Sequence, residues 1–571
     1  MIKLNFVKNY ILKLYIIIFI ANFLETLGIS LIPILFSSIF AKEKLINKNS
    51  TLEFFSKFDS LNLNELQIVL IIFLLFIFKN LILIGTNYFR LNILYKIKIK
   101  IADLLYDAYL KSNLITLQSK NSSEISRNFM TESNQAAHFY INFSYIFQEV
   151  TLIIFLFFIL AAVNLKLTFV VLTLVILFIL FINFFIIKKI KYYASESIKS
   201  RFYFLNSIKQ NLESIKEIKI FGKYSFFKKI FTNSFNNNEK NSIKNNFVQE
   251  IPRNILEILF ITIICLFLFM VINFNILNEI HLGEVILLGV IAVRLIPSFN
   301  KINHYVHLYY QFKVSRDQVF NDIEKFYRTD KKNLNINDTL EFDKNLNFIS
   351  LKNACFDYKT FDQPNNKFKL ENINLKFYKN KINSLVGPSG SGKSTIINLI
   401  SGLLPLKSGN YIINNQEYKT LPLNIKKHIS YLPQQIYLLD DTIINNIAFG
   451  ENEKDINIKK IKKILFLVGL NKVVENFPKK LKTKIGERGN ILSGGQLQRI
   501  GIARSLYFDK KIMILDEPTS SLDLKNSQQI LKVLKKIKKN RIVIIVTHSL
   551  LFAKASDNSY FVEKGIVKKI K

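Results

Sequence analysis

Residues 1–310 alternate between long apolar runs and stretches rich in lysine and asparagine. The hydrocarbon core of a bilayer needs about 20 apolar residues per helix. A succession of such runs favours membrane spans over buried core helices, because a helix satisfies its own backbone polar groups in lipid. We expect six transmembrane helices, over Leu14–Phe40, Gln67–Phe89, Phe143–Val163, Leu167–Ile187, Ile255–Phe274 and Gly283–Val306.

The loops between these runs predict the orientation of the chain in the membrane. The segments 90–127 and 188–250 are crowded with Lys and Arg, whereas 275–282 contains neither. The positive-inside rule therefore places the N-terminus, both long loops and the C-terminal half in the cytoplasm. The first apolar run is too long for a cleavable signal peptide, and no small-residue cleavage site follows it.

Apolar residues become sparse between about 318 and 346, where KKNLNIND is typical of a linker. Short strand-like runs then alternate with glycine turns and helices, which is an α/β pattern. We predict a membrane domain over 1–317, a linker over 318–346 and a cytoplasmic α/β domain over 347–571. No repeat of 20–50 residues is apparent, so this arrangement occurs once in the chain.

The formal net charge of +36 raises the question of nucleic-acid binding. However, the lysines are spread along a chain that is also rich in Ile, Asn and Phe, and no nucleic-acid recognition motif accompanies them. We therefore expect no nucleic-acid partner, and we assign the positive charge to attraction by anionic membrane lipids. Cys265 and Cys355 fall in different predicted domains, so no disulfide framework is expected.

The most informative polar motif is GPSGSGKST at 387–395, which follows the apolar run Ile382–Val386. A strand, a glycine-rich loop and a helix N-terminus together surround phosphate oxygens with N–H groups. We expect a helix to begin near Lys393, whose ammonium reaches the β- and γ-phosphates of ATP, and Ser394 to ligate Mg²⁺. The predicted cradle comprises Gly387, Ser389, Gly390, Ser391, Gly392, Lys393, Ser394 and Thr395.

A second apolar run, Ile512–Leu515, ends in two carboxylates. Asp516 is expected to hold Mg²⁺ directly or through water. Glu517 is best placed to polarise the attacking water as a general base. His548 follows another apolar run, Arg541–Val546, where it either caps that strand or reaches the phosphates.

Five motifs thus occur in fixed order: the P-loop, LSGGQ at 492–496, IMILDE at 512–517, SSLD at 520–523 and His548. This series resembles the nucleotide-binding domain of ATP-binding cassette (ABC) proteins. The resemblance implies that His548 contacts the γ-phosphate.

The same resemblance implies roles for residues outside the P-loop. Gln434, in YLPQQ, would sense Mg²⁺ and contact the membrane domain, and Tyr358 would stack on adenine. The signature would lie at a helix N-terminus and complete the ATP site of a second subunit, with Asp523 at the seam. The signature residues concerned are Ser493, Gly494, Gly495 and Gln496.

Six spans followed by one cassette resemble an ABC exporter half-transporter over essentially the whole chain. The resemblance implies a dimer. Because the catalytic and signature residues are both intact, we expect a homodimer. It also implies short coupling helices near Ser112–Ser123 and Glu213–Phe221, and KIGERG at 484–489 resembles the segment before an exporter signature. Pro518 and Ser549 depart from the family pattern, since exporters more often carry Ala and Arg there.

Three segments, EIKIFGK at 217–223, IPRNILE at 251–257 and RLIPSFNKI at 294–302, resemble flippases for lipid-linked oligosaccharides. The resemblance implies movement of a polyprenyl-pyrophosphate-linked glycan across the cytoplasmic membrane of a bacterium. Alternatives of the same architecture are an exporter of phospholipid, lipid A or drugs, and an exporter of peptides or bacteriocins. A regulatory protein gated by ATP is a further alternative, against which the intact Glu517 argues.

Charges inside the predicted spans allow two hypotheses about the membrane domain. Lys79 and Arg294 lie about 16–18 Å deep at 1.5 Å per residue, and Arg253 stands at the cytoplasmic end of the fifth span. Because charges at such depth are costly, they usually face a cavity or an opposite charge. These cations either line an inward cavity for a pyrophosphate head group, which arginine can bind bidentately, or pair with Glu25 and Glu257.

Overall fold

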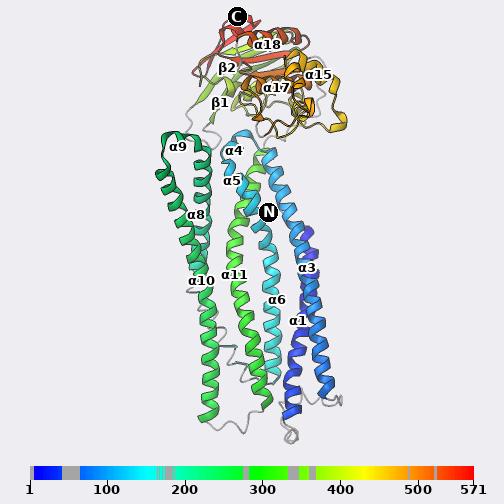
Figure 1. Cartoon of the computed structure of the whole chain (residues 1–571), viewed down its shortest axis with the longest axis vertical. Helices are drawn as coiled ribbons and strands as arrows, with labels where there is room; N and C mark the ends of the chain where they lie inside the picture. Colours follow the sequence, from blue (N-terminus) through cyan, green and yellow to red (C-terminus); the bar gives the residue numbers. More distant parts are fainter. Residues whose placement is uncertain are drawn as a thin grey trace. The chain divides into compact units, whose positions relative to one another are not determined.

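The computed structural model describes residues 5–40, 65–163, 187–273, 282–331, 346–358, 368–486, 489–519 and 524–571, with a few single positions between 165 and 184. The chain forms two compact units, whose elements are labelled in Figure 1. Unit 1 comprises residues 1–110 and 121–325, and unit 2 comprises 111–120 and 326–571.

Unit 1 is built from long helices: α1 (Asn5–Phe40), α3 (Glu65–Lys111), α6 (Ser133–Val163), α8 (Ile187–Glu213), α10 (Tyr224–Asn273) and α11 (Leu282–Lys331). Among the described residues, three stretches are long and apolar enough to cross a membrane, namely Tyr10–Ile32, Leu66–Lys111 and Ser122–Ala162. They contain most of the first three predicted spans. The fifth and sixth lie on α10 and α11, and the fourth lies largely outside the described residues.

The spans pack through narrow apolar seams and leave the rest of their apolar surface exposed. Leu152, Leu156 and Leu160 recur every four residues along α6, so they share one face and join a core with Ile29 of α1 and Leu295 of α11. By contrast, the first half of α3, residues 66–89, is apolar nearly all round and exposes most of its large side chains. A helix of that kind belongs in lipid.

Two short helices coincide with the expected coupling helices. They are α4 (Leu114–Gln118) and α9 (Ile215–Phe221), which joins α8 to α10 (Figure 1). Ile115 of α4 is 1% exposed and belongs to the core of unit 2. On α9, in contrast, Ile220 is 79% exposed. Between α4 and α6 lie α5 (Ser122–Arg127) and one π-helical turn, Asn128–Glu132.

The structure differs from the predicted domain boundary. Residues 318–331 were expected in the linker, but α11 continues through them to Lys331. Val319, Ile323 and Phe326 are buried and recur at helical spacing, which explains why the helix persists where apolar residues become sparse. The rest of the expected linker, 332–345, lies outside the described residues.

Unit 2 contains two sheets. The antiparallel sheet has the order β2-β1-β4-β5, formed by β1 (Phe348–Asp357), β2 (Lys369–Tyr378), β4 (Ser408–Ile413) and β5 (Gln416–Tyr418). The larger sheet has the order β10-β9-β3-β8-β7-β6, formed by β3 (Ile382–Val386), β6 (Ile429–Leu432), β7 (Ile512–Asp516), β8 (Ile542–Thr547), β9 (Asn558–Glu563) and β10 (Ile566–Lys569). All neighbours in the larger sheet are parallel except β10 and β9.

The central strands are buried on both faces, as expected for a parallel sheet covered by other layers. On β7, Ile512 and Ile514 belong to one core, and Met513 and Leu515 belong to the other. The helices of unit 2 beside α4 are α12 (Lys393–Ile400), α13 (Leu423–Lys426), α14 (Ile443–Ile447), α15 (Ile458–Leu467), α16 (Asn471–Glu475), α17 (Gly494–Tyr507), α18 (Leu524–Ile537) and α19 (Leu550–Ala555).

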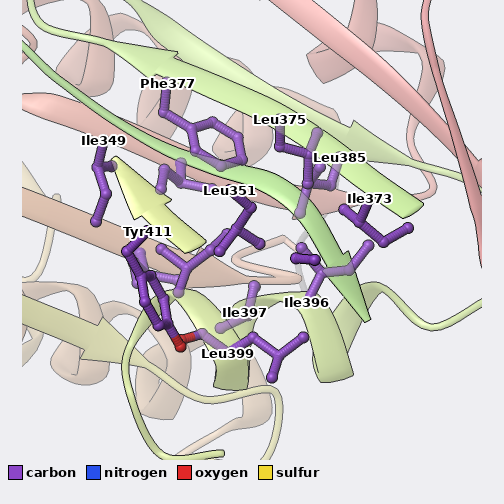
Figure 2. Packing of buried hydrophobic residues seen from close by; sticks show 14 of the residues in the cluster. Ile349, Leu351, Ile373, Leu375, Phe377, Leu385, Ile396, Ile397, Leu399 and Tyr411 are labelled. Carbon is purple, nitrogen blue, oxygen red and sulfur yellow. The ribbon is translucent and has the colours of Figure 1, made fainter. Parts of the chain in front are cut away.

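The first core fixes α12, the helix that follows the glycine-rich loop. Ile396, Ile397 and Leu399 of α12 lie among apolar side chains of both sheets (Figure 2). Tyr411 of β4 donates a hydrogen bond from its hydroxyl to the Leu399 carbonyl at 2.9 Å. Helix α12 is therefore held by packing from both sheets.

Candidate functional site

Four neighbouring parallel strands, β6, β7, β8 and β3, end at one edge of the larger sheet. Gln434 lies two residues beyond β6, Asp516 ends β7, His548 follows β8, and the glycine-rich loop follows β3. The carboxyl-terminal edge of such a sheet is where α/β proteins place their ligands. The fold thus brings together motifs that are more than 100 residues apart in the sequence.

Two glycines of the loop are required by close approach. A side chain at Gly387 would place its Cβ 2.1 Å from the Val562 carbonyl oxygen. Gly392 has φ +106°, and a Cβ there would lie 2.4 Å from the Phe368 ring. Any other residue at these positions would displace the loop, so their replacement would alter the cradle before any ligand contact is lost.

Lys393 begins α12, as the sequence predicts, and its side chain lies against the loop. Its ammonium donates hydrogen bonds to the carbonyls of Gly387 at 2.9 Å and Pro388 at 2.7 Å. Burial lowers the pKa of Lys393. The Ser391 hydroxyl is also buried and has no hydrogen-bond partner among the described residues, which suits it to a phosphate oxygen.

The residues expected to hold Mg²⁺ converge from two elements. The Ser394 hydroxyl on α12 donates to the Asp516 carboxylate at the end of β7 at 3.3 Å. Burial, helped by the negative charge of Glu517, raises the pKa of Asp516 to about 6, although the Ser394 hydrogen bond and the positive charge of Lys393 oppose the shift. A cation beside a crowded, buried carboxylate would relieve that cost.

This donor set fits Mg²⁺. Magnesium prefers oxygen ligands, and proteins commonly hold it with one or two side chains while substrate phosphates and water supply the rest. Within the described ranges no group of three His, Cys, Asp or Glu side chains forms a self-sufficient metal site. The serine and aspartate oxygens therefore match an ion that arrives with a nucleotide.

Glu517 lies between two of the predicted site residues. Its carboxylate accepts a hydrogen bond from the Gln434 amide at 3.0 Å and lies 3.3 Å from His548 Nδ1. The sequence assigned these side chains separately, and the structure brings all three together. The sequence left two roles for His548, a cap on the strand or a contact with the phosphates. Its side chain is exposed, so it is accessible to a ligand.

The backbone of Glu517 is unusual. Its φ is +48°, in the left-handed region that residues other than glycine occupy at a cost of about 1–3 kcal/mol. Its N–H donates to the Val546 carbonyl at 3.0 Å, and its own carbonyl accepts from the Gln498 amide at 2.7 Å. Sequence reasoning missed Gln498, and its position two residues after LSGGQ was the available signal.

Tyr358 lies beside the phosphate loop. Its hydroxyl is 3.2 Å from the Thr395 hydroxyl, and its ring packs edge-on against Phe356 with centroids 4.8 Å apart. The half-buried ring therefore sits close to the nucleotide cradle. Stacking on adenine remains a prediction.

The signature residues lie at the N-terminus of α17. Ser493 is the N-cap: its hydroxyl accepts from the Gln496 N–H at 3.3 Å, and the Gln496 side chain accepts from the Ser493 N–H at 2.9 Å. This capping box fixes the helix start. Ser493 and Gly494 are exposed, and Gly495 follows them into the helix. Asp523 lies outside the described residues.

In unit 1, Lys79 and Arg294, the two cations predicted to lie near the middle of the membrane, pair with the same acidic residue. Glu25, whose side chain is 4% exposed, lies 3.1 Å from Lys79 and 2.5 Å from Arg294. This geometry supplies the pairing that the sequence offered as one of two hypotheses. The side chain of Arg253 lies outside the described set.

Sequence reasoning missed two further polar contacts in unit 1. Lys301 lies 3.1 Å from Glu149, whose side chain is buried. Arg90 donates to the Gln148 side chain at 2.6 Å and stacks over Tyr145. All of these contacts join different helices, so spacing along the chain does not reveal them.

Comparison with known proteins identifies both halves of the chain. A family model described as "ABC transporter" matches residues 370–520, and one described as "ABC transporter transmembrane region" matches residues 15–296. The chain belongs to the ABC transporter family. The expected arrangement, a helical membrane domain fused to an α/β P-loop domain that binds ATP, is confirmed.

Curated relatives of this ABC protein match over part of their length. A "Putative export ATP-binding/permease protein" of Rickettsia typhi is 40% identical over 221 residues, which is 38% of this chain and 37% of that protein. An "ATP-dependent lipid A-core flippase" of Wigglesworthia glossinidia brevipalpis is 38% identical over 218 residues, with the same shares of the two chains. The matched segments thus span little more than a third of these relatives.

A solved structure extends the likeness to the whole fold. It is described as "Structure of a bacterial Atm1-family ABC exporter with ATP bound", and it aligns with a TM-score of 0.74 over 99% of this chain and 95% of that chain. The sequence identity is 16%, so this comparison shows the exporter fold alone.

The geometry at Glu517 leads to a first prediction. Glu517→Gln should retain nucleotide binding, because Lys393, Ser394 and Asp516 are untouched. It should lose most ATP turnover, since removal of a general base typically costs about 10²–10⁴-fold. Turnover is measured as phosphate release by the purified protein, and nucleotide binding with a fluorescent ATP analogue. Turnover at the wild-type rate would show that the role assigned to Glu517 is wrong.

Proposed function

We propose that this protein is an ATPase that works as a homodimer in the cytoplasmic membrane of a bacterium and exports or flips a lipid substrate. The observation that carries the proposal is the convergence, at one sheet edge, of a phosphate cradle with Gln434, Glu517 and His548. That set contains an anion site, a general base and two polar groups directed at the base. These are the types of group that hydrolysis of a nucleotide requires.

Each residue of this set has a task in hydrolysis. Lys393 and the loop N–H groups bind the β- and γ-phosphates, and bound Mg²⁺ would neutralise charge on the phosphate oxygens beside Ser394 and Asp516. Glu517 accepts a proton from the attacking water. Gln434 and His548 hold the Glu517 carboxylate in position through the contacts at 3.0 and 3.3 Å.

The signature helix supports a site shared between two copies. The exposed N-cap Ser493 and the first turn of α17 form a helix N-terminus, which attracts anions through its free N–H groups and dipole. The residues around Lys393 already form a cradle from other elements of unit 2. A second copy that supplied its own α17 to this cradle would close over the γ-phosphate, so that ATP joins the subunits and hydrolysis releases them.

The two short helices of the cytoplasmic extensions support the same assembly. Ile115 of α4 is buried in the core of unit 2 of its own chain. Ile220 and Phe221 of α9 are exposed side by side. Exposed apolar side chains on a cytoplasmic helix are suited to a protein contact, and we assign that contact to the nucleotide-binding domain of the second copy.

For the substrate, we propose a lipid-linked oligosaccharide with a pyrophosphate head group. Relatives named lipid A-core flippases support a lipid substrate, and the flippase-like segments described above favour the glycan-carrying class. Within the spans, one acid, Glu25, faces two cations, Lys79 and Arg294. This cluster keeps an excess positive charge that an anionic head group could share, because arginine can exchange a carboxylate for a phosphate.

A mixed dimer tests the shared ATP site. In a heterodimer of a Lys393→Ala subunit and a Ser493→Arg subunit, both defects fall in one of the two sites, and the other site keeps an intact loop and an intact signature. We expect ATPase activity in the heterodimer, isolated with two affinity tags, and almost none in either homodimer. Full activity in one mutant homodimer would argue against sharing.

The head-group role is tested by Arg294→Ala. In proteoliposomes this variant should lose flipping of a lipid-linked oligosaccharide and the stimulation of ATPase by that substrate, while basal ATPase survives. Lys301→Ala is the matched control, since it removes another cation of α11 that is paired with a buried acid. We expect the control to keep flipping. Flipping by a Lys79/Arg253/Arg294 triple-alanine protein would leave these cations only a structural role.

A further inference from the structure

Gln498 is a buried amide that none of the motifs accounts for. It lies on α17, five residues beyond the N-cap Ser493, and is 3% exposed. Its side-chain N–H donates a 2.7 Å hydrogen bond to the main-chain carbonyl of Glu517. The partner is therefore the backbone of the residue that carries the catalytic carboxylate.

The Glu517 backbone depends on outside support. Its left-handed φ of +48° is unfavourable for a side chain of this size. The residue that follows is Pro518, which has no N–H with which to close the turn. Two hydrogen bonds hold the residue instead, one from its N–H to Val546 of β8 and one to its carbonyl from Gln498. Removing the second takes away the hydrogen bond that Gln498 gives to the Glu517 carbonyl.

The helix that carries Gln498 is firmly placed. Ile500, Ile502 and Ala503 of α17 are buried in the same core as Met513 and Leu515 of β7. The capping box fixes the other end of the helix at Ser493. The separation of five residue positions from Ser493 to Gln498 corresponds to about 7.5 Å along the axis. Because Ser493 and Gln498 are held by the same helix, a movement of the signature end of α17 also moves Gln498.

We infer that Gln498 is a positioning residue, which holds Glu517 in its reactive conformation and links that conformation to the signature helix of the same subunit. This inference rests on the proposed function, in which α17 binds ATP held by the second copy. ATP that draws α17 into place at one site acts through Gln498 on Glu517 of the other site. This contact raises the activity of the second site, which keeps part of its activity when the first site binds no ATP.

Steady-state kinetics test the positioning role. Gln498→Met has a similar length but no donor, and Gln498→Glu places an acceptor against the Glu517 carbonyl. We expect kcat for ATP to fall by about 10–100-fold in both, because small misplacements of a reacting group cost this much. The KM for ATP should stay close to the wild-type value, since the cradle around Lys393 is unchanged.

Arg499→Met is the matched control for these variants. Arg499 is the next residue of α17, and its guanidinium donates to the Gly469 carbonyl at 3.0 Å, so the change also removes a hydrogen bond from this helix to a main-chain carbonyl. We expect kcat close to wild type. A wild-type kcat in Gln498→Met, or an equal loss in Arg499→Met, would overturn the inference.

A dimer with one live site locates the effect. One subunit carries Lys393→Ala, so the live site combines the loop and Glu517 of its partner with its own signature helix. Gln498→Met should lower ATPase about 10–100-fold when placed in the subunit that supplies Glu517, and change it little when placed in the Lys393→Ala subunit. A loss that comes mainly from the Lys393→Ala subunit would show that Gln498 acts on the signature instead, and would overturn the inference.

The outcomes separate this inference from the function on which it rests. If Glu517→Gln is fully active, the proposed hydrolysis mechanism fails. If Glu517→Gln is inactive while Gln498→Met is fully active, only the positioning role fails. If the dimer with one Lys393→Ala subunit has no ATPase, two competent sites are needed together, and the kcat of the Gln498→Met homodimer decides the positioning role.

Discussion

The alignment of four parallel strands, β6, β7, β8 and β3, is the constraint on which the site depends. Their interiors are apolar and buried on both faces, so packing fixes where each strand ends. Because the strands are parallel, the residues just beyond their carboxyl ends lie at the same edge of the sheet. A change in the packing of β7 would therefore move Asp516 and Glu517 relative to α12, even though neither carboxylate is part of the core.

The same arrangement explains how one helix can serve two sites. The N-terminus of α17 is exposed at Ser493, while its middle is buried in the same core as Met513 and Leu515 of β7, the strand that Glu517 follows. In the proposed dimer, an anion bound at the exposed end of α17 therefore acts on a helix that is hydrogen-bonded to the main chain of Glu517. This coupling needs no long pathway, because one helix and one hydrogen bond span it.

In unit 1 the main constraint is the pairing of buried charges. Glu25 is buried against two cations, and a buried charge that loses its partner is strongly unfavourable. Glu25 therefore has to keep a cation beside it if the proposed anionic substrate binds to this cluster. In the proposed function Lys79 stays on Glu25 while Arg294 turns to the anionic head group. Arg294 is the more exposed of the two side chains, which makes it the better residue to alter.

Local pattern was enough to predict much of this protein. The apolar run before GPSGSGKST and the start of α12 at Lys393 follow from local chemistry, whereas the short helices α4 and α9 were expected from the resemblance to ABC exporters. Residues 318–331 were assigned to the linker, yet α11 continues through them, because Val319, Ile323 and Phe326 form a narrow apolar stripe among many polar residues. The sequence named the pairing of Lys79 and Arg294 with Glu25 as one of two hypotheses but did not decide between them, and it did not reveal the hydrogen bond of Gln498 to Glu517, because these contacts join elements far apart in the chain.

The central claim is that α17 of one copy completes the nucleotide cradle of another. Cysteines at Ser389, in the loop, and Ser493, at the α17 N-cap, test it directly after Cys265 and Cys355 are changed to serine in a Glu517→Gln background. The account predicts an ATP-dependent disulfide between subunits, seen as a dimer on a non-reducing gel, which is absent when Lys393 is also changed to alanine. Equal cross-linking with and without ATP, or none under either condition, would contradict it.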